Sequence, residues 1–578
     1  MISFTFPKSW NFIFAGFKKN TMKNIVALLS VLFITANSFA QDCKVIPPSA
    51  MENIKENLSF LANDELEGRL PGTRGANVAS DFIAEKFQEF GLVPYTENGT
   101  FYQNFEMSDW VNVNKNKTTL SIDGESKTLN ESFYVLPQSS NESVSGDLVY
   151  VGFGIEAEEQ KHNDYKKLSE KKLKGKIFVI DVSSPDGIHP HSKYLAYHNL
   201  DARAEKAVEK GAIGIIFVNE GEMASDPKIK FRKIKNSGVP VVFLKEVPGE
   251  KAKKLKYASI EVLVKEQMIE ARNVVGLWNN NAERTLIIGA HYDHLGWGED
   301  NSLYKGERAI HNGADDNASG TTGLIELANF FSKDTNFTSL NVLFIAFSGE
   351  ERGLLGSKYF SNNMMLPPEA ISYMLNMDMI GRLEDRQLAV SGTGTASKWE
   401  EVLEYASCDL DLKLSESGVG PSDHTSFYRK NIPVLHFFTG THKDYHKPSD
   451  DAELINFEGI YKVLNVMVNV IYKVGDRPLE FLVTKDNSAR STPKFNVTLG
   501  IVPDYMYEEG GVKIDGVTEG KPASTGGLQE GDIIVQMGKV KVTDMYSYMD
   551  ALALYKKGDE ITVVAKREGT DKEFNVKF

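Results

Sequence analysis

This 578-residue chain contains only two cysteines, Cys43 and Cys408. That number excludes a disulfide-scaffold protein, although a single bridge between the two stays open in an oxidising compartment. The chain has no basic run, and its formal net charge of −14 argues against nucleic acid or an anionic membrane as a partner. Past residue 40, no apolar run is long enough for a membrane span. The GxSxG motif of serine hydrolases and the HExxH motif of single-zinc proteases are also missing.

The first 40 residues differ in composition from the rest of the chain. They contain four lysines and no acid, and an apolar core, "NIVALLSVLFITA", precedes the small residues Ser38 and Ala40. This pattern is typical of a secretory signal peptide that ends near Ala40. The sequence therefore predicts an exported protein, periplasmic or secreted.

The remaining residues have the composition of a soluble globular protein, with 41% hydrophobic and 25% charged residues over the whole chain. Changes in the pattern of apolar and polar residues divide this part of the chain into an interrupted α/β domain and two smaller modules. The expected divisions are a first α/β part at 41–145, a β-rich insert at 146–264, a second α/β part at 265–475, a polar linker at 476–494 and a small β-rich domain at 495–578.

Four apolar runs in the second α/β part have the character of buried strands. They are "RTLIIGAHYDH", "LNVLFIAFSGEE", "ISYMLNMDMIG" and "IPVLHFFTG", and they alternate with helical segments such as "TTGLIELANFFS" and "FEGIYKVLNVMVNVIYKV". Near-continuous apolar strands between helices indicate a sheet that is buried on both faces. The predicted fold class is α/β, with a mixed, mostly parallel sheet flanked by helices.

Residues that can bind a metal or move a proton follow these strands or precede the first helix. They are His291 and Asp293, Asp315 and Asp316, Glu350 and Glu351, Asp378, and His446. Ligands of open α/β sheets bind at the carboxyl ends of the strands, so we expect these side chains to converge there. Histidine combined with carboxylate favours zinc over magnesium or calcium. These residues occupy five positions along the chain, which exceeds the three protein ligands that one catalytic zinc needs and favours two ions and a bridging carboxylate.

Five motifs in this order make the chain similar to a known family. "GAHYDH", "NGADDNASG", "FSGEERGLLGS", "NMDMIG" and "DYHKPSDD" resemble the co-catalytic dizinc aminopeptidases, a family that also contains glutamate carboxypeptidases. The resemblance covers residues 50–145 and 265–475, and it implies a zinc exopeptidase-like fold with two Zn2+ ions per chain.

The resemblance also implies a role for each motif residue. His291 and Asp378 would hold one zinc, Glu351 and His446 would hold the other, Asp315 would bridge them, Glu350 would be the general base, and Tyr445 would stabilise the oxyanion. Asp293 would orient His291, and the Asp315–Asp316 bond would be the family's cis peptide. His294, His311 and His442 are expected near the site without binding metal, His424 in the pocket wall and His436 in the core.

The two smaller modules also resemble known domains. Residues 146–264 are similar to a protease-associated domain, and residues 495–578 to a PDZ domain. In "TLGIVPD", the backbone N–H groups of Leu499, Gly500 and Ile501 would then bind a peptide C-terminus; a plain strand start is the alternative interpretation.

Together these features predict an exported aminopeptidase that acts on peptides with a free N-terminus, through a metal-bridging water activated by Glu350. Three alternatives stay open. A glutaminyl cyclase-like transferase would use one zinc, which fits the doubled acid of "GADDNASG" poorly. A carboxypeptidase for acidic peptides would need arginines near the pocket, for which Arg382 and Arg429 are the candidates. A non-catalytic, receptor-like binding protein would have a degenerate ligand set.

Overall fold

The computed structural model describes most of the chain after residue 42. The described ranges are 43–188, 192–220, 226–245, 252–298, 300–484, 497–503, 507, 510–518, 520–543, 545–556 and 558–578. The predicted signal peptide, residues 1–40, lies outside them, and so do residues 485–494 of the predicted linker. Within the described ranges, no helix combines the length and the apolar character that crossing a bilayer requires.

The largest sheet has nine strands, in the order β1-β15-β17-β16-β18-β21-β19-β20, and β2 also pairs with β15. The strands are β1 (Val93–Pro94), β2 (Tyr102–Ser108), β15 (Met268–Trp278), β16 (Thr285–His291), β17 (Asn341–Phe347), β18 (Ile371–Met377), β19 (Gln387–Ser391), β20 (Asp411–Ser415) and β21 (Val434–Phe438). The central strands β17, β16, β18 and β21 are parallel, and β15 and β19 border them in antiparallel orientation. The predicted α/β class with a mixed sheet is confirmed, and the carboxyl ends of the four central strands share one edge.

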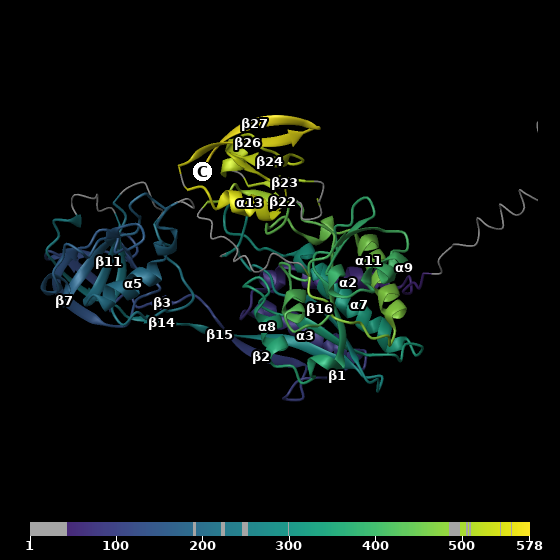
Figure 1. Ribbon diagram of the computed structural model, residues 1–578. Helices are drawn as coiled ribbons and strands as arrows, with labels where there is room; N and C mark the ends of the chain where they lie inside the picture. The colour runs from purple at the N-terminus through teal and green to yellow at the C-terminus, as the bar shows by residue number, and fades with distance from the viewer. Residues whose placement is uncertain are drawn as a thin grey trace, which may run out of the picture.

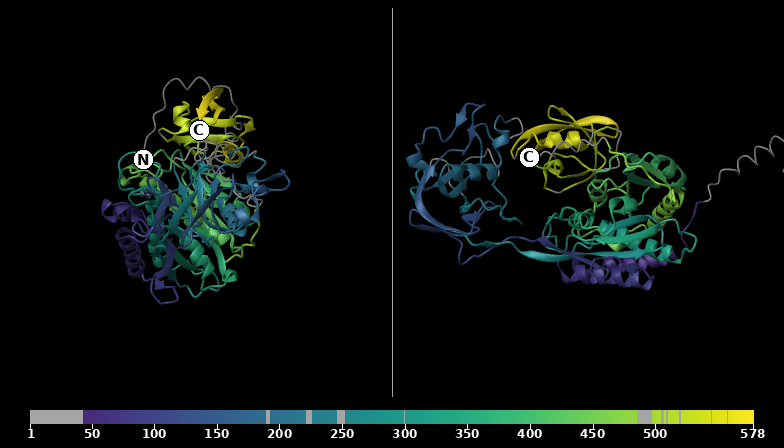
Figure 2. Two further views of the ribbon diagram at one scale, coloured as in Figure 1. Left: turned by 90° about the vertical axis from the view of Figure 1, so that its left-hand side faces the viewer. Right: turned by 60° about the horizontal axis from the view of Figure 1, so that its bottom comes forward.

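Helices cover both faces of this sheet. On one face, Ile288 and Phe344 belong to an apolar layer with α2 (Ala50–Leu61), α3 (Arg74–Glu89), α7 (Gly320–Lys333), α9 (Trp399–Ala406) and α11 (Phe457–Val474). On the other face, Ile287 and Leu343 pack with α8 (Leu355–Asn362) and α10 (His424–Tyr428). Figure 2 shows the N-terminal helices, in purple, along one face. Because both faces are covered, every residue of β16 and β18 is buried, which explains the unbroken apolar runs in the sequence.

A second sheet of eight strands forms the inserted module, in the order β5-β4-β13-β7-β10-β11-β12-β6. Its strands are β4 (Thr119–Ile122), β5 (Glu125–Lys127), β6 (Phe133–Val135), β7 (Ser143–Tyr150), β10 (Lys176–Asp181), β11 (Ala212–Val218), β12 (Val241–Leu244) and β13 (Tyr257–Glu261). The sheet therefore includes residues upstream of the expected boundary at residue 146. The reason is that β4 pairs with β13 and β6 pairs with β12. A local sequence pattern does not encode pairing between strands so far apart in the chain.

A two-stranded ribbon connects the inserted module to the large sheet. On the way out, β2 is followed by β3 (Asn112–Val113), and on the way back β14 (Val264–Lys265) is followed by β15. Each outgoing strand pairs antiparallel with a returning one, β2 with β15 and β3 with β14. The chain thus leaves and re-enters the large sheet side by side, as Figure 1 shows.

The C-terminal module is a six-stranded sheet with its own apolar core. Its elements are β22 (Ile501–Pro503), β23 (Val512–Val517), β24 (Ile533–Met537), β25 (Val540–Lys541), α13 (Met545–Leu552), β26 (Glu560–Arg567) and β27 (Thr570–Lys577). In the predicted peptide-binding loop, the N–H of Gly500 donates to Thr498 Oγ1 at 3.0 Å, and Leu499 is buried. The Thr441 hydroxyl donates to the Pro503 carbonyl at 2.7 Å, which joins this module to the loop before His446.

A disulfide fixes the N-terminal end of the described chain. Cys43 is bonded to Cys408, just beyond α9, with their Cα atoms 6.0 Å apart. The next residue, Lys44, exchanges backbone hydrogen bonds of 2.8 and 2.7 Å with the Asn469 side chain on α11. The bridge, which the sequence left open, therefore fastens the start of the fold to the C-terminal helices of the large domain.

Removing this bridge should destabilise the large domain. The bond closes a loop with a sequence separation of 365 residues, and such cross-links typically stabilise a fold by about 2–4 kcal/mol. We expect a Cys408→Ser variant to melt roughly 5–15 °C below the parent. Reductant should lower the parent's melting temperature to the same value and leave that of the variant unchanged. A parent that is insensitive to reductant would contradict the stabilising role.

Candidate metal centre

The predicted metal-binding residues come together at the carboxyl edge of the large sheet. His291 is the last residue of β16, Asp378 directly follows β18, and Glu350 and Glu351 lie just beyond β17. His446 lies in the loop that follows β21 and has a left-handed backbone, with φ of 55°. These strands are parallel, so their ends deliver the side chains to one place.

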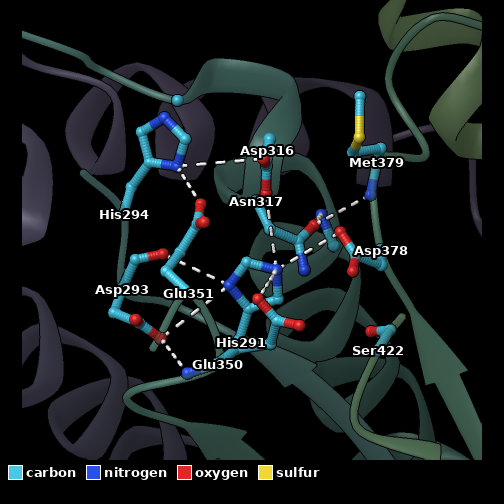
Figure 3. A network of polar contacts seen from close by, with 12 residues as sticks. His291, Asp293, His294, Asp316, Asn317, Glu350, Glu351, Asp378, Met379 and Ser422 are labelled. Carbon is cyan, nitrogen blue, oxygen red and sulfur yellow. Dashed lines mark hydrogen bonds and ion pairs between the residues drawn. The ribbon is translucent and has the colours of Figure 1, made fainter. Parts of the chain in front are cut away.

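Asp316 lies between two of these histidines. It belongs to a short π-helical turn, η4 (Ala314–Ser319), that precedes α7. Its Oδ1 is 3.4 Å from His291 Nε2, and its Oδ2 is 3.2 Å from His446 Nε2. One carboxylate thus presents one oxygen to each histidine (Figure 3 shows the His291 side).

The spacing of the side-chain atoms fits ligands of shared ions. Asp378 Oδ1 is 3.3 Å from His291 Nε2, and Glu351 Oε2 is 3.2 Å from His446 Nε2. Zinc–ligand bonds of about 2.0–2.1 Å in tetrahedral geometry separate two ligand atoms by about 3.3 Å. In both groups, His291–Asp316–Asp378 and His446–Asp316–Glu351, each distance from the histidine Nε2 to a carboxylate oxygen has this spacing.

The backbone selects the ring nitrogen that each histidine offers. Nδ1 of His291 is 3.2 Å from the carbonyl oxygen of Asp293, and Nδ1 of His446 is 3.0 Å from the carbonyl oxygen of Asn301. A carbonyl only accepts, so each Nδ1 carries the proton and each Nε2 keeps its lone pair for a metal. Asp293 therefore contacts His291 through its backbone. Its carbonyl is nearer to the ring than its carboxylate, which is 3.8 Å away.

The prediction that Asp315 bridges the two groups is contradicted by the geometry. Asp315 Oδ1 accepts a 2.6 Å hydrogen bond from the Gly381 N–H, and its Oδ2 lies 3.2 Å from His442 Nε2. Successive residues of the turn direct their side chains to different sides, so only Asp316 reaches both histidines. The cis peptide bond joins Asp316 to Asn317, one position after the predicted Asp315–Asp316 bond. Two adjacent aspartates cannot be told apart by motif spacing alone.

The adjacent glutamates Glu350 and Glu351 have different surroundings. Burial raises the pKa of Glu350 well above its usual range, which the positive charge of His291 offsets only in part. Burial would also raise the pKa of Glu351, but the charges of His446 and His294 outweigh it and hold that pKa well below the usual range. The Glu350 N–H donates to Asp293 Oδ1 at 3.2 Å, and its Oε2 is 3.9 Å from His291 Nε2.

His294 is closer to the candidate ligands than the sequence analysis expected. Its Nδ1 lies 2.7 Å from Glu351 Oε1 but 3.9 Å from Asp316 Oδ2. With these two carboxylates it forms a set of atoms within 4.8 Å of one another, so it is a possible ligand by distance alone. The unequal distances fit a hydrogen bond that orients Glu351, whereas His446 is equally far from both carboxylates.

Sequence reasoning did not identify the two residues that support the turn of Asp316. Arg69, fully buried, donates to the carbonyls of Tyr292, Asn312 and Gly313 at 2.7, 2.6 and 3.0 Å, and burial lowers its pKa to about 10. The carboxylate of Asp450 accepts from the N–H of Asp315 at 3.0 Å and from that of Asp316 at 3.1 Å. A lone loop arginine and an acid behind "HKPS" carry no local signal for these long-range contacts.

The remaining predicted residues lie close to the cluster. Tyr445 stacks its ring on that of His446, with the centroids 3.9 Å apart. The rings of His424 and His436 stack at 4.4 Å. Burial lowers the pKa of His424 well below its usual range and that of His436 to about 4, which keeps both neutral. Asp423 is fully buried, and burial raises its pKa to about 6.

Comparison with known proteins agrees with this architecture. Residues 273–471 match the model of Peptidase family M28, residues 144–252 match the PA domain, and residues 494–578 match the PDZ domain. Aminopeptidase YwaD from Bacillus subtilis (strain 168) is 23% identical over 484 residues, which cover 78% of this chain and 94% of that protein. Leupeptin-inactivating enzyme 1 from Streptomyces exfoliatus is 29% identical over 183 residues, 31% of this chain and 38% of the relative.

A solved structure, that of BSAP, a zinc aminopeptidase from Bacillus subtilis, aligns with a TM-score of 0.44 and 21% identity, and it covers 74% of this chain and 95% of that one. The family matches coincide with the three modules of the fold, since the first spans the central strands and α7 to α11, the second lies in the inserted sheet and the third is the C-terminal sheet. The chain therefore carries a peptidase family M28 domain, interrupted by a PA domain and followed by a PDZ domain.

Proposed function

We propose that this chain is a zinc-dependent aminopeptidase that binds two Zn2+ ions and removes N-terminal residues from peptides. The observation that carries the proposal is the position of Asp316, with one oxygen 3.4 Å from His291 and the other 3.2 Å from His446. A carboxylate shared in this way is what a two-ion site requires. The M28 match and the aminopeptidase names of its relatives support the reaction class.

In this proposal, two ligand groups share Asp316. His291 and Asp378 complete one group, and Glu351 and His446 complete the other. When bound, zinc supplies Lewis-acid polarisation of the scissile carbonyl and makes a water molecule more acidic. The protein contributes fixed ligand positions at the ends of rigid strands, with each Nε2 selected by a backbone carbonyl.

Glu350 is the proposed general base. It borders the His291 group without matching the ligand spacing, since its Oε2 is 3.9 Å from His291 Nε2. It would accept a proton from the attacking water and return it to the departing amine. Tyr445, stacked on His446, is the proposed donor to the oxyanion.

The charges around the site favour a free N-terminus over a free C-terminus in the substrate. Carboxylates outnumber histidines in the two ligand groups with Glu350 beside them, and a protonated α-amine is their natural partner. Arg382, a candidate for binding a substrate carboxylate, is paired with Asp450 at 3.3 Å and Asp444 at 3.5 Å. Arg429, the other candidate, is exposed at the end of α10. Neither presents an unpaired guanidinium to the ligand atoms.

Two further parts of the proposal concern location and partners. We propose export to the periplasm or the exterior, supported by the signal-like residues 1–40 and by the Cys43–Cys408 disulfide, since such bonds persist in oxidising compartments. We also propose that the PDZ domain binds a peptide C-terminus. The match of residues 494–578 to the PDZ domain supports this part of the proposal, although the Gly500 N–H of the predicted loop already donates to Thr498 Oγ1.

The direct test measures zinc content and cleavage on the purified protein. We expect two zinc ions per chain, hydrolysis of aminoacyl anilides and of peptides with a free N-terminus, and no cleavage of N-blocked peptides. A strong chelator should abolish the activity, and zinc should restore it. One zinc with cyclisation of N-terminal glutamine would indicate a transferase instead. Cleavage from the C-terminus would indicate a carboxypeptidase, and zinc binding without turnover would indicate a binding protein.

Glu350→Gln tests the proposed base. The amide keeps the size of the side chain but cannot accept a proton, so kcat should fall by about 10²–10⁴-fold while both zinc ions remain bound. Zinc analysis and steady-state kinetics of the same preparation separate these effects. Retention of more than a tenth of the parent kcat would rule out Glu350 as the base.

A matched pair of substitutions tests which aspartate bridges. Asp316→Asn removes the negative charge that two ions would share, so we expect zinc content to fall to one ion or fewer and activity to be lost. Asp315→Asn keeps an oxygen that can accept from the Gly381 N–H, so both ions and most activity should remain. The reverse pattern would restore Asp315 as the bridge.

A further inference from the structure

The PA domain contacts the peptidase domain through a cluster of charged residues beside one half of the metal site. This junction cluster consists of Asp109, Arg232, Asp300 and Arg352. Arg232, from the loop between β11 and β12 of the PA domain, pairs through Nη2 with Asp300 Oδ2 at 2.6 Å and through Nη1 with Asp109 Oδ1 at 3.5 Å. Arg352 Nη1 is 3.6 Å from the same Asp109 oxygen.

Arg232 is held firmly on its own side of the junction. Its guanidinium carbon lies 3.9 Å from the ring centroid of Trp110, an arrangement that favours stacking. The preceding carbonyl, that of Phe231, accepts from the Val111 N–H at 2.9 Å, and the N–H of Ile234 donates to Glu266 Oε1 at 2.6 Å. Both partners belong to the connecting ribbon, so the arginine is fixed relative to the two segments that link the PA domain to the large sheet.

The segment that Arg232 holds also supports two proposed metal ligands. Asp300 is followed by Asn301, whose carbonyl accepts the His446 Nδ1 proton at 3.0 Å and whose Nδ2 donates to the Glu351 carbonyl at 2.9 Å. The Leu303 N–H donates to the His446 carbonyl at 3.0 Å. A second set of contacts also connects Arg232 to Glu351. Arg232 and Arg352 both face Asp109, and Arg352 is the residue after Glu351.

The other half of the site is supported from within the peptidase domain. His291 Nδ1 faces the Asp293 carbonyl, and the Asn317 side chain accepts from the Met379 N–H, next to Asp378, at 3.1 Å. Among the hydrogen bonds and ion pairs of the described residues, none joins a PA-domain residue to these groups. The two halves therefore differ in what holds them: the peptidase core supports His291 and Asp378, whereas the junction cluster supports Glu351 and His446.

We propose that Arg232 of the PA domain is a positioning residue for the Glu351–His446 half of the metal site. Through Asp300 and Asn301 it fixes the ring orientation of His446 and the backbone of Glu351, so the PA domain sets the affinity for one ion and not the other. This inference rests on the proposed two-ion function. Outer partners of this kind typically change metal affinity by about 10–100-fold.

The test is a zinc titration of the metal-free full-length protein against a competing chromophoric chelator, with two dissociation constants fitted. For Arg232→Ala, one of the two Kd values should rise about 10–100-fold, and the other should stay within about twofold of the parent value. Asp300→Asn should have the same selective effect. Because this side chain is 41% exposed, the variant replaces Arg232→Ala in the test if the alanine variant folds poorly. The control is Lys235→Ala, which removes a cation of the same domain that pairs internally with Asp201; it should change neither constant.

A charge reversal distinguishes positioning from a general loss of stability. Arg232→Asp should raise the same Kd, and Arg232→Asp combined with Asp300→Arg should recover it, because the pair is restored with opposite polarity. Two unchanged constants in both Arg232→Ala and Asp300→Asn, or an equal loss at both sites, would overturn the inference. Failure of the proposed function would look different, since the parent itself would then bind fewer than two ions.

Discussion

Buried carboxylate charge at the carboxyl edge of the central sheet is the constraint that the rest of the structure must satisfy. Asp293, Asp315 and Asp450 are fully buried, and Asp316 is 4% exposed. A buried, unpaired charge costs several kcal/mol, so each acid needs donors or cations. Backbone N–H groups serve Asp293, Asp315 and Asp450, and Arg382 adds a cation for Asp450. The histidines beside Asp316 and Glu351 leave an excess of negative charge that divalent ions would neutralise.

The surrounding architecture holds this charged edge in a fixed shape. Parallel strands bring His291, Glu351 and Asp378 to the same edge of the sheet. Arg69 connects the end of β16 to the turn that carries Asp316, because it donates to the carbonyls of Tyr292 and Gly313. The PA domain returns to the large sheet through a paired ribbon, which brings Arg232 next to Asp300. The PDZ domain touches the loop before His446 through Thr441. The PA domain therefore reaches the Glu351–His446 side of the site, and the PDZ domain contacts the loop that leads to His446.

The sequence predicted those features that local pattern encodes. Continuous apolar runs identified the central strands, and the motifs at their ends identified His291, Glu350, Glu351, Asp378 and His446, which the fold brings together. Features that depend on distant partners were out of reach. The choice between Asp315 and Asp316 is decided by Gly381 and His442, which lie far along the chain. The support from Arg69 and the start of the PA sheet at β4 likewise depend on contacts that no short stretch of sequence records.

The central claim is that Asp316 holds two metal ions between two ligand groups. Anomalous X-ray diffraction from zinc-loaded crystals, recorded on both sides of the zinc absorption edge, tests it most directly. We expect two anomalous peaks about 3.5–4 Å apart, one beside His291 and Asp378 and the other beside Glu351 and His446, with the Asp316 carboxylate between them. A single peak, or a peak beside Asp315 and His442, would contradict it.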